Sequence, residues 1–271
     1  MNSTYESVTI HEKYVQANGL RIFYRECGVG APMILLHSGT AASNEWGALI
    51  PFFGRYFHVL APDCRGHGNT DNPDGRLSYR LMAEDMLAFS RAVDLERPVV
   101  CGWSDGGHIA LEMGIRYPDA VQALVVGAAG YRVSEEALAE YREIGFEGPG
   151  LLDFEKIERE MPEAVSYWRR THGEERWRPL LTQLSHLWFS PLEYKARHVR
   201  GIESPVLLVA GDRDHTFFVE EALDMYTQLC QGELVILPNA DHALRETHTD
   251  LFGQIVLDYL LRHSLDISTY P

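Results

Sequence analysis

The feature that most constrains this chain is a repeated alternation of short apolar runs with longer amphipathic segments. The runs are four or five residues long, too short for helices. They are apolar at nearly every position, as strands buried on both faces of a parallel sheet must be. They comprise Met33–Leu36, Phe57–Ala61, Pro98–Cys101, Ala123–Val126, Val206–Ala210 and Leu234–Leu237.

Segments with helical spacing lie between these runs, and a hairpin precedes them. The predicted helices are Leu81–Phe89, Gly107–Tyr117, Glu220–Cys230 and Asp250–Arg262. Near the start, Tyr14–Ala17 and Leu20–Tyr24 flank Asn18-Gly19, a pair that tolerates the positive φ of a tight hairpin turn. Strands that alternate with helices predict βαβ units. We therefore predict an α/β fold with a mostly parallel, doubly wound sheet.

The alternation breaks once, after the run that ends near Ala129. About 75 residues (204 − 129) separate it from the next strand, which is far too long for a simple connection. Leu180, Leu184 and Trp188 fall on one face of a helix, together with Leu187. We predict that residues 131–200 form a helical cap, or lid, over one edge of the sheet. Residues 1–130 and 201–271 then form the core domain.

Composition excludes several classes of partner. Lys and Arg total 24 against 39 Asp and Glu, so the net charge is 24 − 39 = −15. Nucleic acids and anionic membranes repel such a chain. No apolar stretch is long enough to span a membrane, the start lacks a signal-peptide pattern, and the four cysteines form no CxxC pair. We expect a cytoplasmic protein with reduced thiols and a small-molecule substrate. The oligomeric state cannot be inferred from the sequence.

The strongest chemical signal is Gly102-Trp103-Ser104-Asp105-Gly106, which follows a buried strand and opens a helix. Small residues at such a turn let the backbone reverse sharply and expose the serine hydroxyl. The helix start behind it offers free N–H groups to a developing oxyanion. A purely structural glycine-rich turn is the alternative. We interpret Ser104 as a nucleophile.

A serine nucleophile needs a base oriented by a carboxylate. Asp212 and Asp214 follow one predicted strand, and His242 follows the next. All lie just past strand carboxyl ends, where open α/β sheets place their sites. Either aspartate could be the acid at this point. His248 is the nearest rival to His242, but it adjoins the final helix.

The order and spacing of these motifs resemble the α/β-hydrolase family along nearly the whole chain. The shared pieces are the hairpin, His37-Ser38-Gly39, Asp63-Cys64-Arg65-Gly66-His67-Gly68, the serine turn, Gly211-Asp212-Arg213-Asp214 and Asp241-His242. The resemblance implies that Ser104 is the nucleophile, His242 the base and Asp214, the second aspartate of the family's G-D-x-D pattern, the acid.

The resemblance also implies an oxyanion hole of two backbone N–H groups. One belongs to Asp105, the residue after the nucleophile. The other lies in the loop after Leu36, where Ser38 replaces the usual glycine of the family. This replacement leaves two candidates for the second donor, Gly39, which we favour, and Thr40.

Substrate-binding residues are suggested near the nucleophile and in the insertion. The Trp-Ser-Asp-Gly-Gly string resembles the biphenyl-hydrolase-like branch, which includes amino-acid ester hydrolases. The Asp105 carboxylate could therefore bind a substrate ammonium group, or instead bond to nearby backbone. Trp103, Trp168 and Trp188 could line a pocket, and core packing is the alternative for the tryptophans of the insertion.

The predicted reaction is hydrolysis of a carboxylic ester, or a related acyl bond, through an acyl-enzyme. Amide, lactone and carbon–carbon bond hydrolysis use the same triad in this family, and a ligand-binding receptor on the same fold is the rival from another class. The resemblance implies no metal and no organic cofactor.

Overall fold

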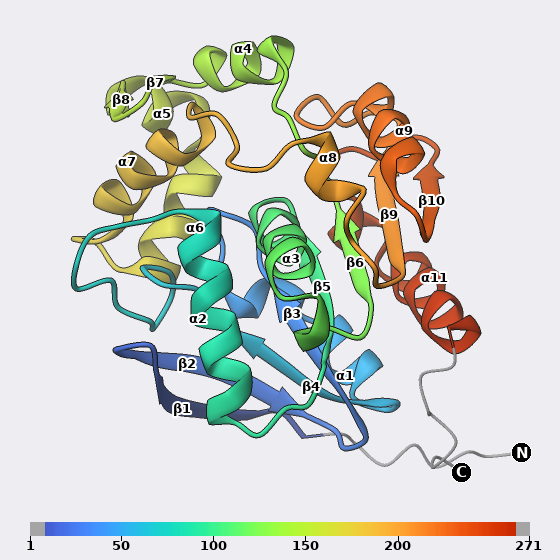
Figure 1. The fold of residues 1–271 in the computed structure, drawn as a ribbon. Helices are drawn as coiled ribbons and strands as arrows, with labels where there is room; N and C mark the ends of the chain where they lie inside the picture. Colours follow the sequence, from blue (N-terminus) through green and yellow to red (C-terminus); the bar gives the residue numbers. More distant parts are fainter. Residues whose placement is uncertain (1–8, 264–271) are drawn as a thin grey trace, which may run out of the picture.

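A single eight-stranded sheet forms the centre of the molecule (Figure 1). The computed structural model describes residues 9–263. The strands, in their order across the sheet, are β1 (His11–Ala17), β2 (Leu20–Cys27), β4 (Phe57–Pro62), β3 (Ala31–Leu36), β5 (Val99–Trp103), β6 (Leu124–Gly127), β9 (Val206–Gly211) and β10 (Gly232–Leu237). Only the β1–β2 and β2–β4 pairs are antiparallel in this sheet. The predicted mostly parallel α/β sheet is confirmed.

The N-terminal hairpin has the turn that its sequence predicts. Strands β1 and β2 pair from His11 opposite Glu26 to Ala17 opposite Leu20. Asn18 and Gly19 connect them with φ angles of 48° and 75°. Asparagine and glycine are the residues that adopt this region at the lowest cost.

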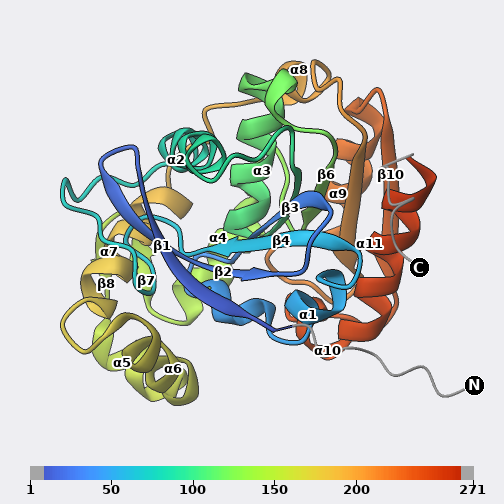
Figure 2. The same ribbon diagram turned by 90° about the horizontal axis from the view of Figure 1, so that it is seen from below.

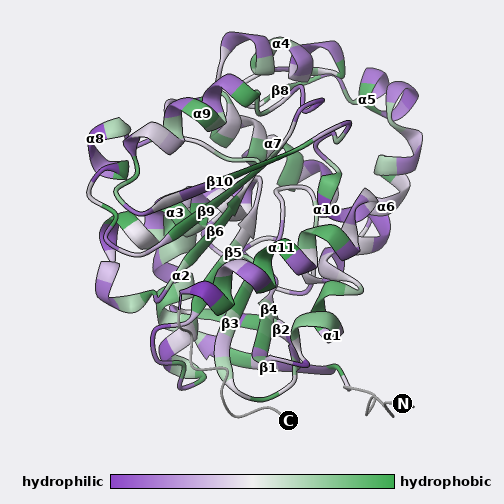
Figure 3. Cartoon of the chain, turned by 90° about the vertical axis from the view of Figure 1, so that its right-hand side faces the viewer, coloured by the Kyte–Doolittle hydropathy of each residue, from purple (hydrophilic) through white to green (hydrophobic). Residues whose placement is uncertain are grey.

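Helices cover both faces of the sheet, as Figure 2 shows. Helices α2 (Tyr79–Ala92), α3 (Asp105–Arg116) and α8 (Ala196–Val199) bury side chains against one face. Helices α1 (Leu49–Phe53) and α11 (Thr249–Arg262) cover the other. Helix α9 (Val219–Gln228) packs on β9 and β10. The central strands are hydrophobic along their length (Figure 3), because alternate side chains enter separate cores above and below the sheet.

The segment between β6 and β9 forms a group of elements above the strands in Figure 1. It contains α4 (Glu135–Glu143), β7 (Phe146–Gly148), β8 (Leu151–Leu152), α5 (Phe154–Glu160), α6 (Pro162–His172) and α7 (Trp177–Trp188). The sequence did not predict the β7–β8 hairpin. We call residues 131–200 the insertion. Its last helix, α8, packs on α3 and α9, so this end of the segment contacts the core.

The insertion has a hydrophobic cluster of its own. Leu180, Leu184 and Trp188 of α7 face this cluster, as their helical spacing predicts, and Leu187 is partly buried against it. Trp168 and Trp177 stack in its centre with ring centroids 6.2 Å apart. Within residues 9–263, no helix is both long and apolar enough to cross a membrane.

Candidate active site

Ser104 lies at a strained turn between β5 and α3. Its φ and ψ angles are 54° and −117°, a region that L-residues rarely occupy. A Cβ atom at Gly102 would collide with the backbone of Gly106, and one at Gly106 would collide with the carbonyl oxygen of Leu36. The two glycines of the motif are thus required by close backbone approach, and the turn carries the serine at the carboxyl end of the strand.

Three side chains from separate loops form a continuous hydrogen-bonded chain. His242 Nε2 lies 3.1 Å from Ser104 Oγ. The other ring nitrogen, Nδ1, lies 2.8 Å from Asp214 Oδ2. If Nδ1 carries the proton and donates it to the carboxylate, Nε2 is free to accept a proton from the serine hydroxyl. The structure therefore brings together the three residues that the resemblance assigns to the triad.

Asp214 is fixed by donors on its second carboxylate oxygen. The backbone N–H groups of Thr216 and Phe217 donate to Oδ1 over 2.8 and 3.0 Å, and the Thr216 hydroxyl donates over 2.9 Å. Burial raises the pKa of Asp214, but the hydrogen bond and charge of His242, with these N–H groups, outweigh it and hold the pKa below its usual value. Asp214 is therefore ionised at neutral pH.

The electrostatic environment of His242 favours its protonated form. Burial lowers the pKa of this imidazole, but the hydrogen bond and charge of Asp214 outweigh burial, and the net pKa is raised. Asp105 and Glu45 add in the same direction. The same neighbours stabilise the imidazolium that forms when His242 accepts the serine proton.

Sheet order explains why these residues meet. The loops that carry Ser104, Asp214 and His242 follow β5, β9 and β10, which run parallel in one half of the sheet. The rival residues, Asp212 and His248, have other partners. Asp212 accepts a hydrogen bond from the backbone N–H of Ala240 over 3.3 Å. His248 caps α11 and lies 2.9 Å from the Thr247 hydroxyl.

The loop after β3 runs beside the serine turn, because β3 and β5 are neighbours in the sheet. Ser38, where the family usually has glycine, donates its backbone N–H to Glu45 Oε2 over 2.9 Å, and its hydroxyl also bonds to Glu45. Glu45 lies in the short helix η1 (Ser43–Trp46) and forms an ion pair with buried Arg245 at 2.9 Å. An ion pair with buried Arg245 thus joins this loop to the segment that follows His242.

Asp105 is a buried carboxylate with several donors of its own. Its Oδ1 accepts hydrogen bonds from the Tyr79 hydroxyl over 2.8 Å and from Trp188 Nε1 over 2.9 Å. A Cβ atom at Gly39 would collide with Oδ2, and the Gly39 backbone N–H stabilises the charged carboxylate. Burial nevertheless dominates and raises the pKa of Asp105. The carboxylate connects α2, the insertion and the loop after β3.

Of the three tryptophans that the sequence suggested for substrate binding, one lines the cavity beside Ser104 and two are packed in hydrophobic clusters. Trp188 lines the cavity beside Ser104. Trp103 is buried in the core, packs edge-on against Phe252 and donates its Nε1–H to the backbone oxygen of His242 over 3.1 Å. Trp168 lies in the hydrophobic cluster of the insertion. Trp103 and Trp168 are not among the residues that line the cavity, since both rings are occupied by core packing.

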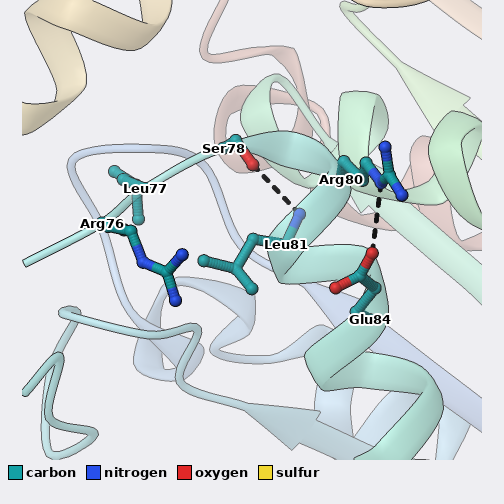
Figure 4. Close-up of a pocket in the computed structure, with 6 residues that line it drawn as sticks. All are labelled: Arg76, Leu77, Ser78, Arg80, Leu81 and Glu84. Carbon is teal, nitrogen blue, oxygen red and sulfur yellow. Dashed lines mark hydrogen bonds and ion pairs between the residues drawn. The ribbon is translucent and has the colours of Figure 1, made fainter. Parts of the chain in front are cut away.

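A small cavity lies next to Ser104, and a larger pocket shares part of its lining. The inner cavity, of about 30 Å³, is lined by Ser104, His242 and Asp105 among others. An outer pocket of about 520 Å³ lies between α4 and the segment after α7, and is lined largely by apolar and aromatic side chains. Arg132, Val133 and Trp188 line both spaces. A further hollow at the start of α2, shown in Figure 4, lacks all three members of the hydrogen-bonded chain.

Sequence reasoning missed several residues of the site. Thr216 contacts both Asp214 and His242, the latter over 2.8 Å. Tyr79, Tyr141 and His108 line the inner cavity. Only Thr216 had a usable signal, since it lies two residues after Asp214 in the same loop. The others come from helix faces, where aromatic residues also serve core packing.

Comparisons with known proteins identify the family and the fold. The model of a family described as the alpha/beta hydrolase family matches residues 33–254. A 2-hydroxy-6-oxo-6-(2'-aminophenyl)hexa-2,4-dienoic acid hydrolase of Metapseudomonas resinovorans is 26% identical, covering 93% of this chain and 92% of its own. The human serine hydrolase BPHL is 27% identical, over 91% and 85%. The solved enol-lactonase of Burkholderia xenovorans LB400 superposes with a TM-score of 0.73 at 21% identity, over 92% of this chain and 100% of its own.

Proposed function

The chain belongs to the α/β-hydrolase family, and from this premise we propose that it cleaves carboxylic esters of small to medium organic substrates through an acyl-enzyme on Ser104. The observation that carries the proposal is the hydrogen-bonded chain from Ser104 through His242 to Asp214, with links of 3.1 and 2.8 Å. A neutral serine hydroxyl becomes a nucleophile when a base at this distance removes its proton.

The proposed reaction has two halves. In the first, His242 Nε2 takes the Ser104 proton as the hydroxyl oxygen attacks the ester carbonyl. The tetrahedral intermediate collapses, and His242 returns the proton to the departing alcohol. In the second, water attacks the acyl-enzyme and transfers its proton to His242, which then protonates Ser104 as the acid leaves. Asp214 keeps the imidazole oriented and stabilises its positive charge.

The oxyanion of each intermediate needs donors on the side of Ser104 that faces β3. The backbone N–H of Asp105 lies at the start of α3, where the helix dipole favours negative charge. The second donor comes from Gly39 or Thr40. The sequence favours Gly39, but because its N–H already stabilises the Asp105 carboxylate, we propose Thr40 as the second donor. Each such donor is typically worth about a hundredfold or more in kcat.

The inner cavity beside Ser104 and the outer pocket that shares part of its lining suggest how an ester would be accommodated. The inner cavity of about 30 Å³ has room for a small group only, since one water needs roughly 10–15 Å³ on the same measure. The outer pocket of about 520 Å³ falls within the usual size of ligand sites. We place a short acyl group beside Ser104 and a larger, apolar alcohol group in the outer pocket.

Carbon–carbon bond hydrolysis is the second candidate. The name of the Metapseudomonas resinovorans relative describes a substrate with hydroxyl, keto and carboxylic acid groups but no ester or amide. Hydrolysis of such a compound has to break a bond between carbon atoms. The match extends over most of both chains, which favours this chemistry above amide hydrolysis.

A labelling experiment with a substrate panel tests the proposal. A fluorophosphonate probe should label the wild-type protein at Ser104, and p-nitrophenyl acetate should give a burst of nitrophenol followed by steady turnover. Activity should fall as the acyl chain is lengthened from acetate to octanoate. Labelling with turnover of 2-hydroxy-6-oxo-6-phenylhexa-2,4-dienoic acid alone would favour the second candidate. Binding of these compounds without labelling would point to a receptor and contradict the proposal.

A further inference from the structure

Three buried histidines stand behind the loop that follows β3. His37, His67 and His172 are at most 2% exposed. The ring centroids of His37 and His67 are 4.9 Å apart, and those of His67 and His172 are 5.9 Å apart. Two of these residues belong to the core, whereas His172 ends helix α6 in the insertion. The cluster therefore joins parts of the molecule that are distant in sequence.

The three rings lie beside three consecutive carbonyl oxygens of the loop after β3, with one nitrogen of each ring close to one oxygen. His37 Nδ1 lies 2.8 Å from the carbonyl oxygen of Ser38. His67 Nε2 lies 2.6 Å from that of Gly39. His172 Nε2 lies 3.0 Å from that of Thr40. His37 and His172 each donate to this loop. Burial holds the pKa of His67 well below its usual value, so this neutral ring has one N–H and donates either to Gly39 or to the carbonyl oxygen of Arg65.

The remaining ring nitrogens also have backbone partners. Cys64 donates its N–H to His37 Nε2 over 2.9 Å, and Gly68 donates its N–H to His172 Nδ1 over 3.0 Å. His67 Nδ1 lies 2.9 Å from the carbonyl oxygen of Arg65. No ring nitrogen of the cluster is left to bind a ligand or metal, so its role has to be sought in what it holds.

The partners of His172 define its protonation state. Because Gly68 donates to Nδ1, that nitrogen carries no proton, and the proton on Nε2 is donated to Thr40. Burial lowers the pKa of His172 to about 4, so the ring is neutral near pH 7. A neutral ring in this tautomer accepts from the core and donates to the loop at once.

Peptide planarity transmits these contacts to the oxyanion donors. A carbonyl and the following N–H belong to one rigid trans unit and point in opposite directions. The contact at Ser38 therefore sets the direction of the Gly39 N–H, and the contact at Gly39 sets that of the Thr40 N–H when His67 carries its proton on Nε2. The contact of His172 fixes the next unit and so holds Thr40 from its other side. These N–H groups are the two candidates for the second oxyanion donor.

We infer that His172 is a positioning residue through which the insertion holds the oxyanion loop, residues 38–40, in its working geometry. The inference rests on the proposed function, because it assigns a role to that site. A second residue of the insertion, Arg176, donates to the carbonyl oxygen of Gly68, the core residue whose N–H bonds to His172. The insertion thus contributes to transition-state stabilisation as well as to the walls of the pocket.

Substitution of His172 tests the inference with p-nitrophenyl acetate and an aryl trifluoromethyl ketone. The ketone forms a hemiketal when Ser104 Oγ bonds to its carbonyl carbon, the proton passes to His242, and the former carbonyl oxygen becomes an oxyanion. His172→Phe keeps a ring of similar size but loses both nitrogens. We expect about a tenfold fall in kcat, part of the loss seen when an oxyanion donor is deleted. KM should stay unchanged, and the ketone should bind about tenfold more weakly.

Two further variants separate positioning from general destabilisation. His172→Gln retains a donor for Thr40 and should recover most of the kcat. Val165→Ala truncates a buried residue on the same helix, α6, without touching the loop, and should leave kcat and ketone affinity unchanged. If His172→Phe does not fold, His172→Leu replaces it in the same comparison.

The outcomes distinguish this inference from the function on which it rests. Wild-type turnover with unchanged kcat and ketone affinity in the folded His172 variant would overturn the inference and leave the proposed function intact. An equal loss in Val165→Ala would also overturn it. A wild-type protein that neither reacts with the fluorophosphonate nor turns over an ester would contradict the proposed function instead.

Discussion

The reactive end of the sheet and the insertion hold their side chains in different ways. Ser104, Asp214 and His242 lie on loops directly after strands, and the backbone ladder of the sheet fixes where those loops begin. Most of the insertion packs around its own aromatic cluster. Its last part, with Tyr194 and Val199, packs on the core, and polar contacts of His172 and Trp188 join the rest to it. We therefore expect the reaction to depend on the backbone geometry of the sheet, and the substrate range to depend on side chains of the insertion that can change without loss of the sheet.

This comparison predicts that the largest losses of activity follow substitution of the residues on loops directly after the strands. Ser104→Ala removes the proposed nucleophile and should lower kcat for p-nitrophenyl acetate by about a millionfold, as in other serine hydrolases. Steady-state kinetics with circular dichroism would check both activity and folding. Ser204→Ala, at a buried serine outside the site, should keep wild-type kcat. Substantial turnover by the Ser104 variant would place the nucleophile elsewhere.

The next largest effect is expected at the orienting acid. Asp214→Asn should lower kcat by about ten-thousandfold, because the amide favours the wrong tautomer of His242. The carboxylate raises the pKa of His242, so the variant should lose its activity at a lower pH than the wild type as the solution is acidified. A pH profile of kcat/KM measures this shift.

Asp212→Asn is the matched control, because this carboxylate bonds to the backbone N–H of Ala240 and not to His242. Its kcat and pH profile should resemble those of the wild type. A larger loss in Asp212→Asn than in Asp214→Asn would reverse the assignment of the acid.

Asp105 lies where the two regions meet, and its substitution sharpens the comparison. Three donors already surround its carboxylate, which supports a role in joining α2, the insertion and the oxyanion loop. Asp105→Asn should therefore lower kcat/KM by about tenfold, to the same extent for an amino-acid ester and for its neutral isostere. Parallel kinetics on the two esters would show this. A loss confined to the amino ester would instead identify Asp105 as a binding site for a substrate ammonium group.

The smallest effect is expected in the insertion. Val133 lines both the inner cavity and the outer pocket. We propose that a large alcohol group extends past this side chain, which Val133→Trp should obstruct. KM for 1-naphthyl acetate should rise a few-fold, while kcat/KM for ethyl acetate stays constant, because only the larger alcohol group needs the outer pocket. Equal effects on the two esters would show that the alcohol group lies elsewhere.

The sequence predicts the core better than the insertion, for a physical reason. Strands such as Val206–Gly211 are apolar on both faces because helices cover both sides of the sheet, and this requirement is visible as an apolar run. Ser104 and His242 could be located because each follows such a strand. The helix α7 could also be predicted, since Leu180, Leu184 and Trp188 repeat at helical spacing.

Other features depend on contacts that no local pattern encodes. The role of Trp103 could not be inferred, because packing against Phe252 and bonding to the backbone of His242 involve residues far along the chain. The β7–β8 hairpin consists of three and two residues, too few for a periodic signal. His172 gave no signal either, since its partners Gly68 and Thr40 are contacted through their backbone atoms.

The most direct test of the account is the mass of the protein during turnover. Wild-type protein mixed with p-nitrophenyl acetate, quenched in acid within the burst and digested, should carry one acetyl group on the peptide that contains Ser104. The modification should accumulate further in variants that slow deacylation, and it should be absent from Ser104→Ala. Turnover without acetylation of Ser104, or with acetylation of a different side chain on the catalytic time scale, would contradict the acyl-enzyme mechanism.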